Sequence, residues 1–291
     1  MSAVFQQYDA EGLERQYIPT HWPIVSPQTT SENWAKRADD FHGRAKVVAD
    51  IAYGTSKRQA LDLLLPGNPD KAPVLAFIHG GYWRSPRFQK RNYSFCVEPL
   101  VEAGAIVAMV EYDLCPDVTM DQLTRQVQSA CAWLWQNVAD YDGDPNRLHV
   151  AGHSAGGHLA ATMASTDWAG FAPGLPPDMV KSIVPISGLF ELEPLRLTSL
   201  NADLRLDPES ARRNSPILIA PATRLPVSVV VGGGETEEFV RQSRAFADQW
   251  RQAASPLSYF ETAGHDHFAV IEAMTERHDP LAAILLKHLG L

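Results

Sequence analysis

The chain has little cysteine, and its cysteines are not spaced for bonding or for metal binding. Its 291 residues include only Cys96, Cys115 and Cys131, an odd number without a C-x-x-C pair. Such a set argues against a disulfide framework or a zinc site and fits a reducing cytoplasm. The metal-binding patterns H-x-x-E-H and H-E-x-x-H are missing as well. We therefore expect a cytoplasmic protein with no metal and no cofactor.

Long hydrophobic runs and clusters of positive charge are also missing. No apolar run approaches the roughly 18 residues of a membrane span. The first residues, MSAVFQQYDAEGLERQY, lack the basic start and apolar segment of a secretory signal. The net charge is −9, with Lys and Arg scattered along the chain. Because nucleic acids and anionic membranes attract clustered positive charge, we expect neither as a partner. A small-molecule substrate is expected instead, and a homodimer is one open alternative to a monomer.

The most informative stretch present is Gly152-His153-Ser154-Ala155-Gly156-Gly157. The apolar run at 147–151 predicts a strand before it, and small residues at 157–164 predict a helix after it. Strand, G-x-S-x-G and helix are typical of a nucleophile elbow, whose tight turn lifts the serine hydroxyl above the sheet edge. We interpret Ser154 as a nucleophile, with His153 and His158 lining or bracing the elbow. The alternative is a glycine-rich connection with an incidental serine.

The rest of the chain alternates predicted strands and helices, which indicates a mostly parallel, doubly wound α/β sheet with helices on both faces. We expect one domain over 1–291, with an N-terminal arm at 1–45 and a small lid insertion at 188–225. The arm should hold one helix, Ser31–Phe41, capped by Ser31. The other ranges are read from apolar patterns: strands at 46–53, 59–65, 73–78, 105–110, 147–151, 183–186, 227–231 and 257–260, and helices at 95–102, 122–137, 237–252 and 268–289.

A serine hydroxyl attacks only if a base takes its proton and an acid holds that base in the right tautomer. In folds with this elbow, the acid and the base lie on loops after late strands. We favour His267 over His265 as the base, because it begins the final predicted helix and Gly264 lets the preceding loop reach back over the sheet. The acid candidate is Glu235, in the glycine-rich loop after 227–231. Glu191, after the preceding strand, is the alternative.

Acyl transfer also needs N–H donors for the negative oxygen of its tetrahedral intermediate. The sequence HGGYW at 79–83 follows a predicted buried strand, where an oxyanion loop belongs. We expect the amides of Gly81, Tyr82 and Ala155 to form the oxyanion hole. Tyr82 and Trp83 are expected to contact the substrate, and packing in the core is the alternative for both aromatic residues. The tryptophans of the arm, Trp22 and Trp34, are expected either at the pocket mouth or packed outside the core.

These motifs together resemble a known family. HGGYW, GHSAGGHLA, the lead-in AYG…QALDLLLP and the closing GHDHF resemble arylformamidases of the kynurenine pathway, in the α/β-hydrolase superfamily. The resemblance runs from about residue 46 to the C-terminus and, more loosely, through QYIPTHW. It implies an α/β-hydrolase fold and a metal-free Ser–acid–His hydrolase that removes the formyl group from N-formylkynurenine. It places the nucleophile on Ser154, the base on His267 and the oxyanion loop on Gly81 and Tyr82. Glu235 departs from the pattern, since animal members carry Asp.

Two other functions remain as alternatives. The subfamily that shares these motifs also includes esterases and amidases. The first alternative is therefore a carboxylesterase or amidase that acts on a different small metabolite. The second alternative lies outside the enzymes and is a non-catalytic binding protein with an α/β-hydrolase fold. Such proteins commonly lack a catalytic group, whereas this sequence supplies a candidate for each one.

Overall fold

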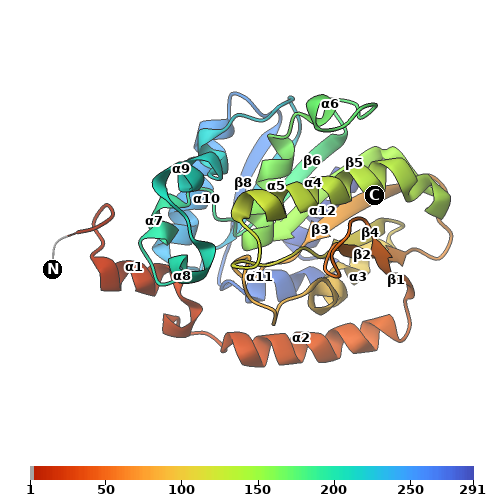
Figure 1. The fold of residues 1–291 in the computed structure, drawn as a ribbon. Helices are drawn as coiled ribbons and strands as arrows, with labels where there is room; N and C mark the ends of the chain where they lie inside the picture. Colours follow the sequence, from red (N-terminus) through yellow and green to blue (C-terminus); the bar gives the residue numbers. More distant parts are fainter. Residues whose placement is uncertain (1–2) are drawn as a thin grey trace.

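The computed structural model describes residues 3–291 and is built around one eight-stranded sheet (Figure 1). The strand order is β1-β2-β4-β3-β5-β6-β7-β8. β2 pairs antiparallel with β1 and β4, and all pairs from β4 to β8 are parallel. This confirms the predicted mostly parallel sheet. The strand bounds are β1 Lys46–Ala52, β2 Ala60–Leu65, β3 Ala72–Ile78, β4 Ile106–Val110, β5 Gly143–His153, β6 Val180–Ile186, β7 Val227–Gly232 and β8 Leu257–Thr262.

Helices cover both faces of the sheet because successive strand residues point to opposite sides. In β3, Val74 and Ile78 belong to the core under one set of helices and Phe77 to the core under the other. The first set is α4 Met120–Asn137, α5 Ala155–Ala164 and α10 Glu237–Trp250; the second is α2 Pro27–His42, α3 Glu98–Glu102, α11 Ala269–Glu272 and α12 Pro280–Leu289. Within residues 3–291, none of the helices combines the length and apolar character needed to cross a membrane.

The N-terminal segment forms two α-helices, not the single one predicted, with a 3₁₀ turn at Pro19–His21 between them. α1 spans Ala10–Tyr17, and α2 begins at Pro27, four residues before the predicted start. Ser26 caps α2, because its hydroxyl accepts the Thr29 N–H at 3.2 Å. Proline suits the first helical position, where its missing N–H is not needed. The Ser31 cap was therefore wrong, and Ser31 lies inside the helix.

The end of the chain also differs from the prediction. The continuous helix predicted over 268–289 is instead α11, a 3₁₀ turn at Ala273–Thr275 and α12. Asp279 caps α12 by accepting the Leu281 N–H at 2.8 Å, and Pro280 fixes the helix start there. Between β6 and β7, the predicted lid segment carries three neighbouring short helices (Figure 1), which are α7 Glu193–Arg196, α8 Asn201–Leu204 and α9 Pro208–Arg213.

The start of α5 lies unusually close to the sheet. A Cβ atom on Gly156 would stand 2.0 Å from the Ile78 carbonyl oxygen, and one on Gly152 would stand 2.3 Å from the Gly156 carbonyl oxygen. Real Cβ atoms do not approach backbone so closely, so glycine is required at both positions. The contact sets the first turn of α5 against the end of β3, where the HGGYW stretch begins.

We predict that Gly156→Ala destabilises the fold. The added methyl group would collide with the Ile78 carbonyl, and such overpacking costs about 1–3 kcal/mol. Urea denaturation followed by circular dichroism measures the loss. Gly67→Ala is the control, because nothing lies within 4 Å of a Cβ atom there. Equal urea midpoints for the two variants would contradict the prediction.

Candidate active site

Ser154 occupies the tight turn between β5 and α5. Its backbone has φ 57° and ψ −117°, a conformation that a non-glycine residue adopts only where the surrounding structure enforces it. The Ser154 N–H donates to the Ile186 carbonyl at 2.8 Å, which fixes the turn to β6. The side chain is almost fully buried and lines a pocket of about 240 Å³. This is the geometry that the elbow motif predicts.

His267 and Glu235 form a buried hydrogen-bonded pair. His267 Nδ1 lies 2.6 Å from Glu235 Oε2, and both side chains are nearly inaccessible to solvent. The other oxygen, Glu235 Oε1, accepts hydrogen bonds from the Ser187 hydroxyl and, at 2.7 Å, from the Gly232 N–H. The carboxylate is therefore held on both sides, and His267 lines the same pocket as Ser154. The structure thus brings the three predicted residues to one site.

The two alternative candidates lie elsewhere. The His265 carbonyl accepts the Gly234 N–H at 2.9 Å, so this residue braces the loop that carries Glu235. The Glu191 carboxylate lies 2.8 Å from the Arg241 guanidinium. Neither His265 nor Glu191 lines the pocket at Ser154.

Two of the three residues predicted to supply oxyanion donors line the same pocket. Gly81 has φ 109° and Tyr82 has φ 52°, so the chain turns sharply after β3. Both residues line the pocket with Ser154. In the part of the chain that the structure describes, the amides of Gly81, Tyr82 and Ala155 have no hydrogen-bond acceptor. A Cβ atom on Gly80 would stand 3.2 Å from the Ser154 Cβ. The donors are therefore close to the serine and free to bind a substrate oxygen.

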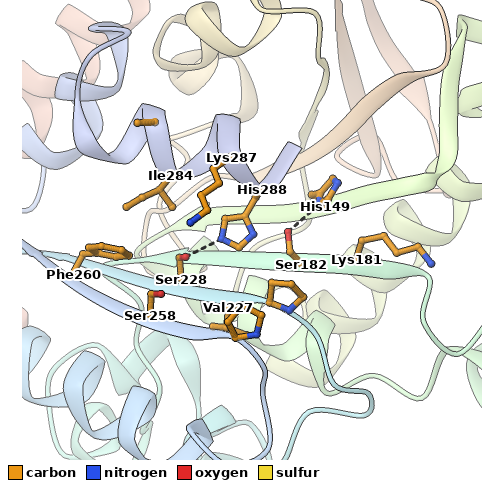
Figure 2. A pocket seen from close by; sticks show the side chains of 13 residues that line it. His149, Lys181, Ser182, Val227, Ser228, Ser258, Phe260, Ile284, Lys287 and His288 are labelled. Atoms are coloured by element: carbon orange, nitrogen blue, oxygen red, sulfur yellow. Dashed lines mark hydrogen bonds between the residues drawn. The ribbon is translucent and has the colours of Figure 1, made fainter. Parts of the chain in front are cut away.

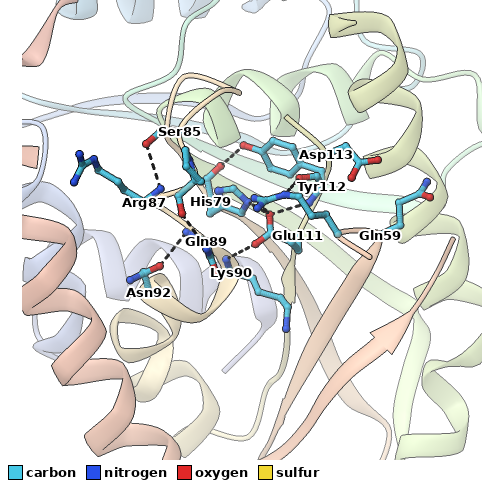
Figure 3. Close-up of polar contacts among 12 residues, drawn as sticks. Gln59, His79, Ser85, Arg87, Gln89, Lys90, Asn92, Glu111, Tyr112 and Asp113 are labelled. Atoms are coloured by element: carbon cyan, nitrogen blue, oxygen red, sulfur yellow. Dashed lines mark hydrogen bonds and ion pairs between the residues drawn. The ribbon is translucent and has the colours of Figure 1, made fainter. Parts of the chain in front are cut away.

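A buried ionic network supports the segment that follows β3 and carries Gly81 and Tyr82 (Figure 3). Glu111 Oε1 lies 2.8 Å from His79 Nε2 and 2.5 Å from an Arg58 guanidinium nitrogen, while Oε2 accepts the Lys90 N–H at 3.1 Å. Burial raises the pKa of Glu111, but His79 and Arg58 outweigh it and leave the pKa below its usual value. The Tyr112 hydroxyl donates to the His79 carbonyl at 2.9 Å. Sequence reasoning missed Glu111, although a charged residue directly after an apolar strand was visible.

His153 ties the elbow to the loop that carries His267. Its Nε2–H donates to the His267 carbonyl at 2.8 Å, and the Tyr93 hydroxyl lies 3.1 Å from its Nδ1. Burial and the neighbouring His267 lower the pKa of His153 well below its usual value. The ring is therefore neutral at pH 7. His153 braces the site, as expected from its place beside the serine.

The predicted aromatic contacts divide into three cases. Tyr82 lines the pocket, and its hydroxyl donates to the Tyr17 carbonyl of the arm. Trp83 does not line it: the side chain is fully buried, with its ring 5.0 Å from that of His158. The expected substrate contact of Trp83 is therefore wrong, because the turn after Gly81 directs this ring into the core. Trp34 is likewise in the core, whereas Trp22 lies edge-on to His267 at 5.3 Å.

Segments distant in sequence complete the pocket. The arm contributes 18–20 and Pro27, the predicted lid contributes Ser199 and Leu200, and the loop after β3 contributes Arg84, Arg87 and Phe88. At about 240 Å³, the pocket is slightly smaller than the roughly 300–1,000 Å³ typical of ligand sites. It therefore favours a small substrate.

A larger cavity of about 460 Å³ lies under α12, over β5 to β8 (Figure 2). Four of its polar side chains form two hydrogen-bonded pairs: His149 Nδ1 lies 2.7 Å from Ser182 Oγ, and His288 Nε2 lies 2.8 Å from Ser228 Oγ. Burial lowers the pKa of each histidine to about 4. Ser154, His267 and the amides described above do not line this cavity, so size alone does not identify the site.

The sheet order and the serine elbow after β5 define an α/β-hydrolase. Comparison with known proteins agrees. Residues 61–249 match the family model described as BD-FAE, and the chain belongs to this family. It is 31% identical to a kynurenine formamidase of Danio rerio over 96% of each chain. A Silicibacter protein proposed to be a thioesterase shares 30% identity and a TM-score of 0.81, covering 94% of this chain and 98% of that one.

A more distant crystal structure shows the fold alone. An esterase of Pyrobaculum calidifontis is 19% identical, with a TM-score of 0.71 over 94% of this chain and 97% of that one. Together, the family and the relatives make this chain a hydrolase of the α/β-hydrolase type.

We predict that acid destabilises the protein partly through His158. Its Nε2–H donates to the Asn214 carbonyl at 2.7 Å, and burial lowers its pKa to about 4. In the unfolded chain a histidine binds a proton below about pH 6.5, so stability is lost as the pH falls from about 6.5 to about 4. One such group contributes up to about 1.4 kcal/mol per pH unit. Urea denaturation between pH 7 and 5 should show a smaller slope for His158→Gln, which keeps an N–H donor.

Exposed His21 supplies the control, because His21→Gln should leave the slope as in the parent. An unchanged slope in His158→Gln would show that this ring is protonated equally in both states.

Proposed function

We propose that the chain hydrolyses a small aryl formamide of the N-formylkynurenine type through an acyl-enzyme on Ser154. One observation carries the proposal: Ser154, His267 and the free amides of Gly81 and Tyr82 all open to one small pocket, with Glu235 buried behind the imidazole. The similarity to a kynurenine formamidase over nearly the whole chain supports the substrate class.

In the proposed mechanism, Ser154 Oγ attacks the formyl carbon while His267 Nε2 takes its proton. Glu235 accepts the Nδ1–H bond at 2.6 Å and stabilises the imidazolium that forms. The amides of Gly81, Tyr82 and Ala155 donate to the oxyanion. When the C–N bond breaks, His267 returns the proton to the leaving amine. Water, activated by the same imidazole, then hydrolyses the formyl ester and releases formate.

A glutamate in place of the familiar aspartate is compatible with this role. The extra methylene lengthens the side chain, so its carboxylate needs its own anchors. The Ser187 hydroxyl and the Gly232 N–H both bind Oε1. These two donors fix the carboxylate, and Oε2 is left to face His267.

We predict that kcat/KM falls steeply as the acyl group grows from formyl to acetyl to butyryl on one aryl amine. The pocket is small and must also hold the aryl group, so little room remains on the acyl side. Steady-state hydrolysis of the series measures this. A preference for butyryl would instead identify a carboxylesterase or amidase for another metabolite.

The Ser154→Ala variant is the control for that series. It should lose about 10⁴-fold or more in kcat, because the three residues act as a unit, and it should no longer be labelled by a fluorophosphonate. If the parent binds the aryl formamides without hydrolysing them, the protein is a binding protein.

We predict a loss of about 10²- to 10⁴-fold in kcat for Glu235→Gln, with little loss of fold. The new amide keeps an oxygen for Ser187 and Gly232 but points an N–H group at His267 Nδ1, which selects the wrong tautomer. Circular dichroism checks that the variant is folded. The matched control is Glu191→Gln, which loses only a half-exposed ion pair with Arg241 and should stay within about twofold of the parent. The reverse pattern would make Glu191 the acid.

A further inference from the structure

Charge is unevenly distributed around the pocket that contains Ser154. Two arginines, Arg84 and Arg87, line it, and no aspartate or glutamate of residues 3–291 does so. The chain as a whole carries a net charge of −9, so this local excess of positive charge runs against the overall composition. A pocket of this sign attracts an anionic ligand.

The two arginines differ in what they bind. Arg84 Nε lies 2.5 Å from an Asp203 carboxylate oxygen on α8, so its charge is already balanced by the predicted lid. Arg87 is exposed, and its guanidinium has no ion-pair or hydrogen-bond partner in the described part of the chain. Figure 3 shows its side chain extending away from the Glu111 network. Of the two arginines that line the pocket, only Arg87 has a free guanidinium.

The loop that carries Arg87 is anchored at both ends. At its start, the Gly81 carbonyl accepts the N–H groups of Arg84 at 3.1 Å and Ser85 at 2.9 Å. At its end, the Phe88 ring stacks on Phe268 with 5.8 Å between centroids. The same short loop therefore carries both the oxyanion amides and Arg87, and its two ends are fixed.

We infer that Arg87 binds a carboxylate on the leaving-group arm of the substrate. A guanidinium presents parallel N–H donors that match one carboxylate, and a single unpaired arginine suits a single negative charge. Arg87 then determines specificity, within the aryl amides proposed above, for those whose ring bears a carboxylate-terminated arm. The amide part of this statement rests on the proposed function, whereas the charge part does not.

The test compares two aryl formamides, one with a free carboxylate on its arm and one with that carboxylate capped as a primary amide. Arg87→Gln should raise the ratio of KM for the charged substrate to KM for the neutral one by about tenfold, as expected for a lost charge-assisted hydrogen bond. The effect should lie in KM and not in kcat, because the contact is remote from the reacting bond. An unchanged ratio would overturn the inference.

Two controls remove the effect of charge alone. Arg212→Gln makes the same change in net charge at an exposed position on α9 outside the pocket and should leave the ratio as in the parent. The double variant Arg84→Gln/Asp203→Asn removes the balanced ion pair without changing the net charge, and it should also leave the KM ratio as in the parent. Asp203→Asn alone frees the Arg84 guanidinium and should lower the ratio by about threefold. A rise of the ratio in Arg212→Gln equal to that in Arg87→Gln would show a general charge effect and overturn the inference.

An ester pair separates this inference from the proposed function. If the parent cleaves aryl esters but neither formamide, the formamidase proposal fails. The charged and neutral esters then give the same ratio test for Arg87. A tenfold rise with the esters supports carboxylate binding in an esterase, and no rise refutes it for either activity.

Discussion

The backbone contact between α5 and the end of β3 is the constraint on which the site depends. Because Gly152 and Gly156 have no side chains, the first turn of α5 rests against the Ile78 carbonyl. Ser154 is thereby held in its strained conformation, next to the loop that presents the amides of Gly81 and Tyr82. The spacing between Ser154 and these amides is set by backbone packing and not by flexible side chains, which is how a preorganised electrostatic site is kept rigid.

His153 joins the elbow at Ser154 to the loop after the last strand, and it does so without placing a further charge at the site. The His153 hydrogen bond to the His267 carbonyl links the elbow to the loop after β8. Burial keeps His153 neutral, so it places no positive charge beside the His267 ring, 4.6 Å away. The imidazolium of the proposed mechanism therefore forms beside the Glu235 carboxylate and a neutral ring.

The features that could be predicted from the sequence are defined by residues close together in the chain. The features that could not be predicted depend on contacts between distant segments. The elbow at Ser154 and the loop at Gly81 are defined by a few adjacent residues, and the mostly parallel sheet follows from the alternation of strands and helices along the chain. The direction of Trp83, by contrast, depends on a left-handed turn at 81–83 that composition does not indicate. Glu111 and Arg87 also escaped notice, because their partners, or the absence of partners, appear only when distant segments meet.

The N-terminal arm is fixed by a part of the chain that is made much later. The Tyr17 hydroxyl donates to Glu238 at 2.6 Å across 221 residues, Gln242 donates to the same hydroxyl, and Trp22 packs on Phe239 and His267. On the ribosome the arm emerges well before this docking surface. The rings of Tyr17 and Trp22 lack these partners until then, and the pocket wall at 18–20 closes only after the loop of His267 has been made. A nascent chain is therefore without a finished site until the loop of His267 has left the tunnel.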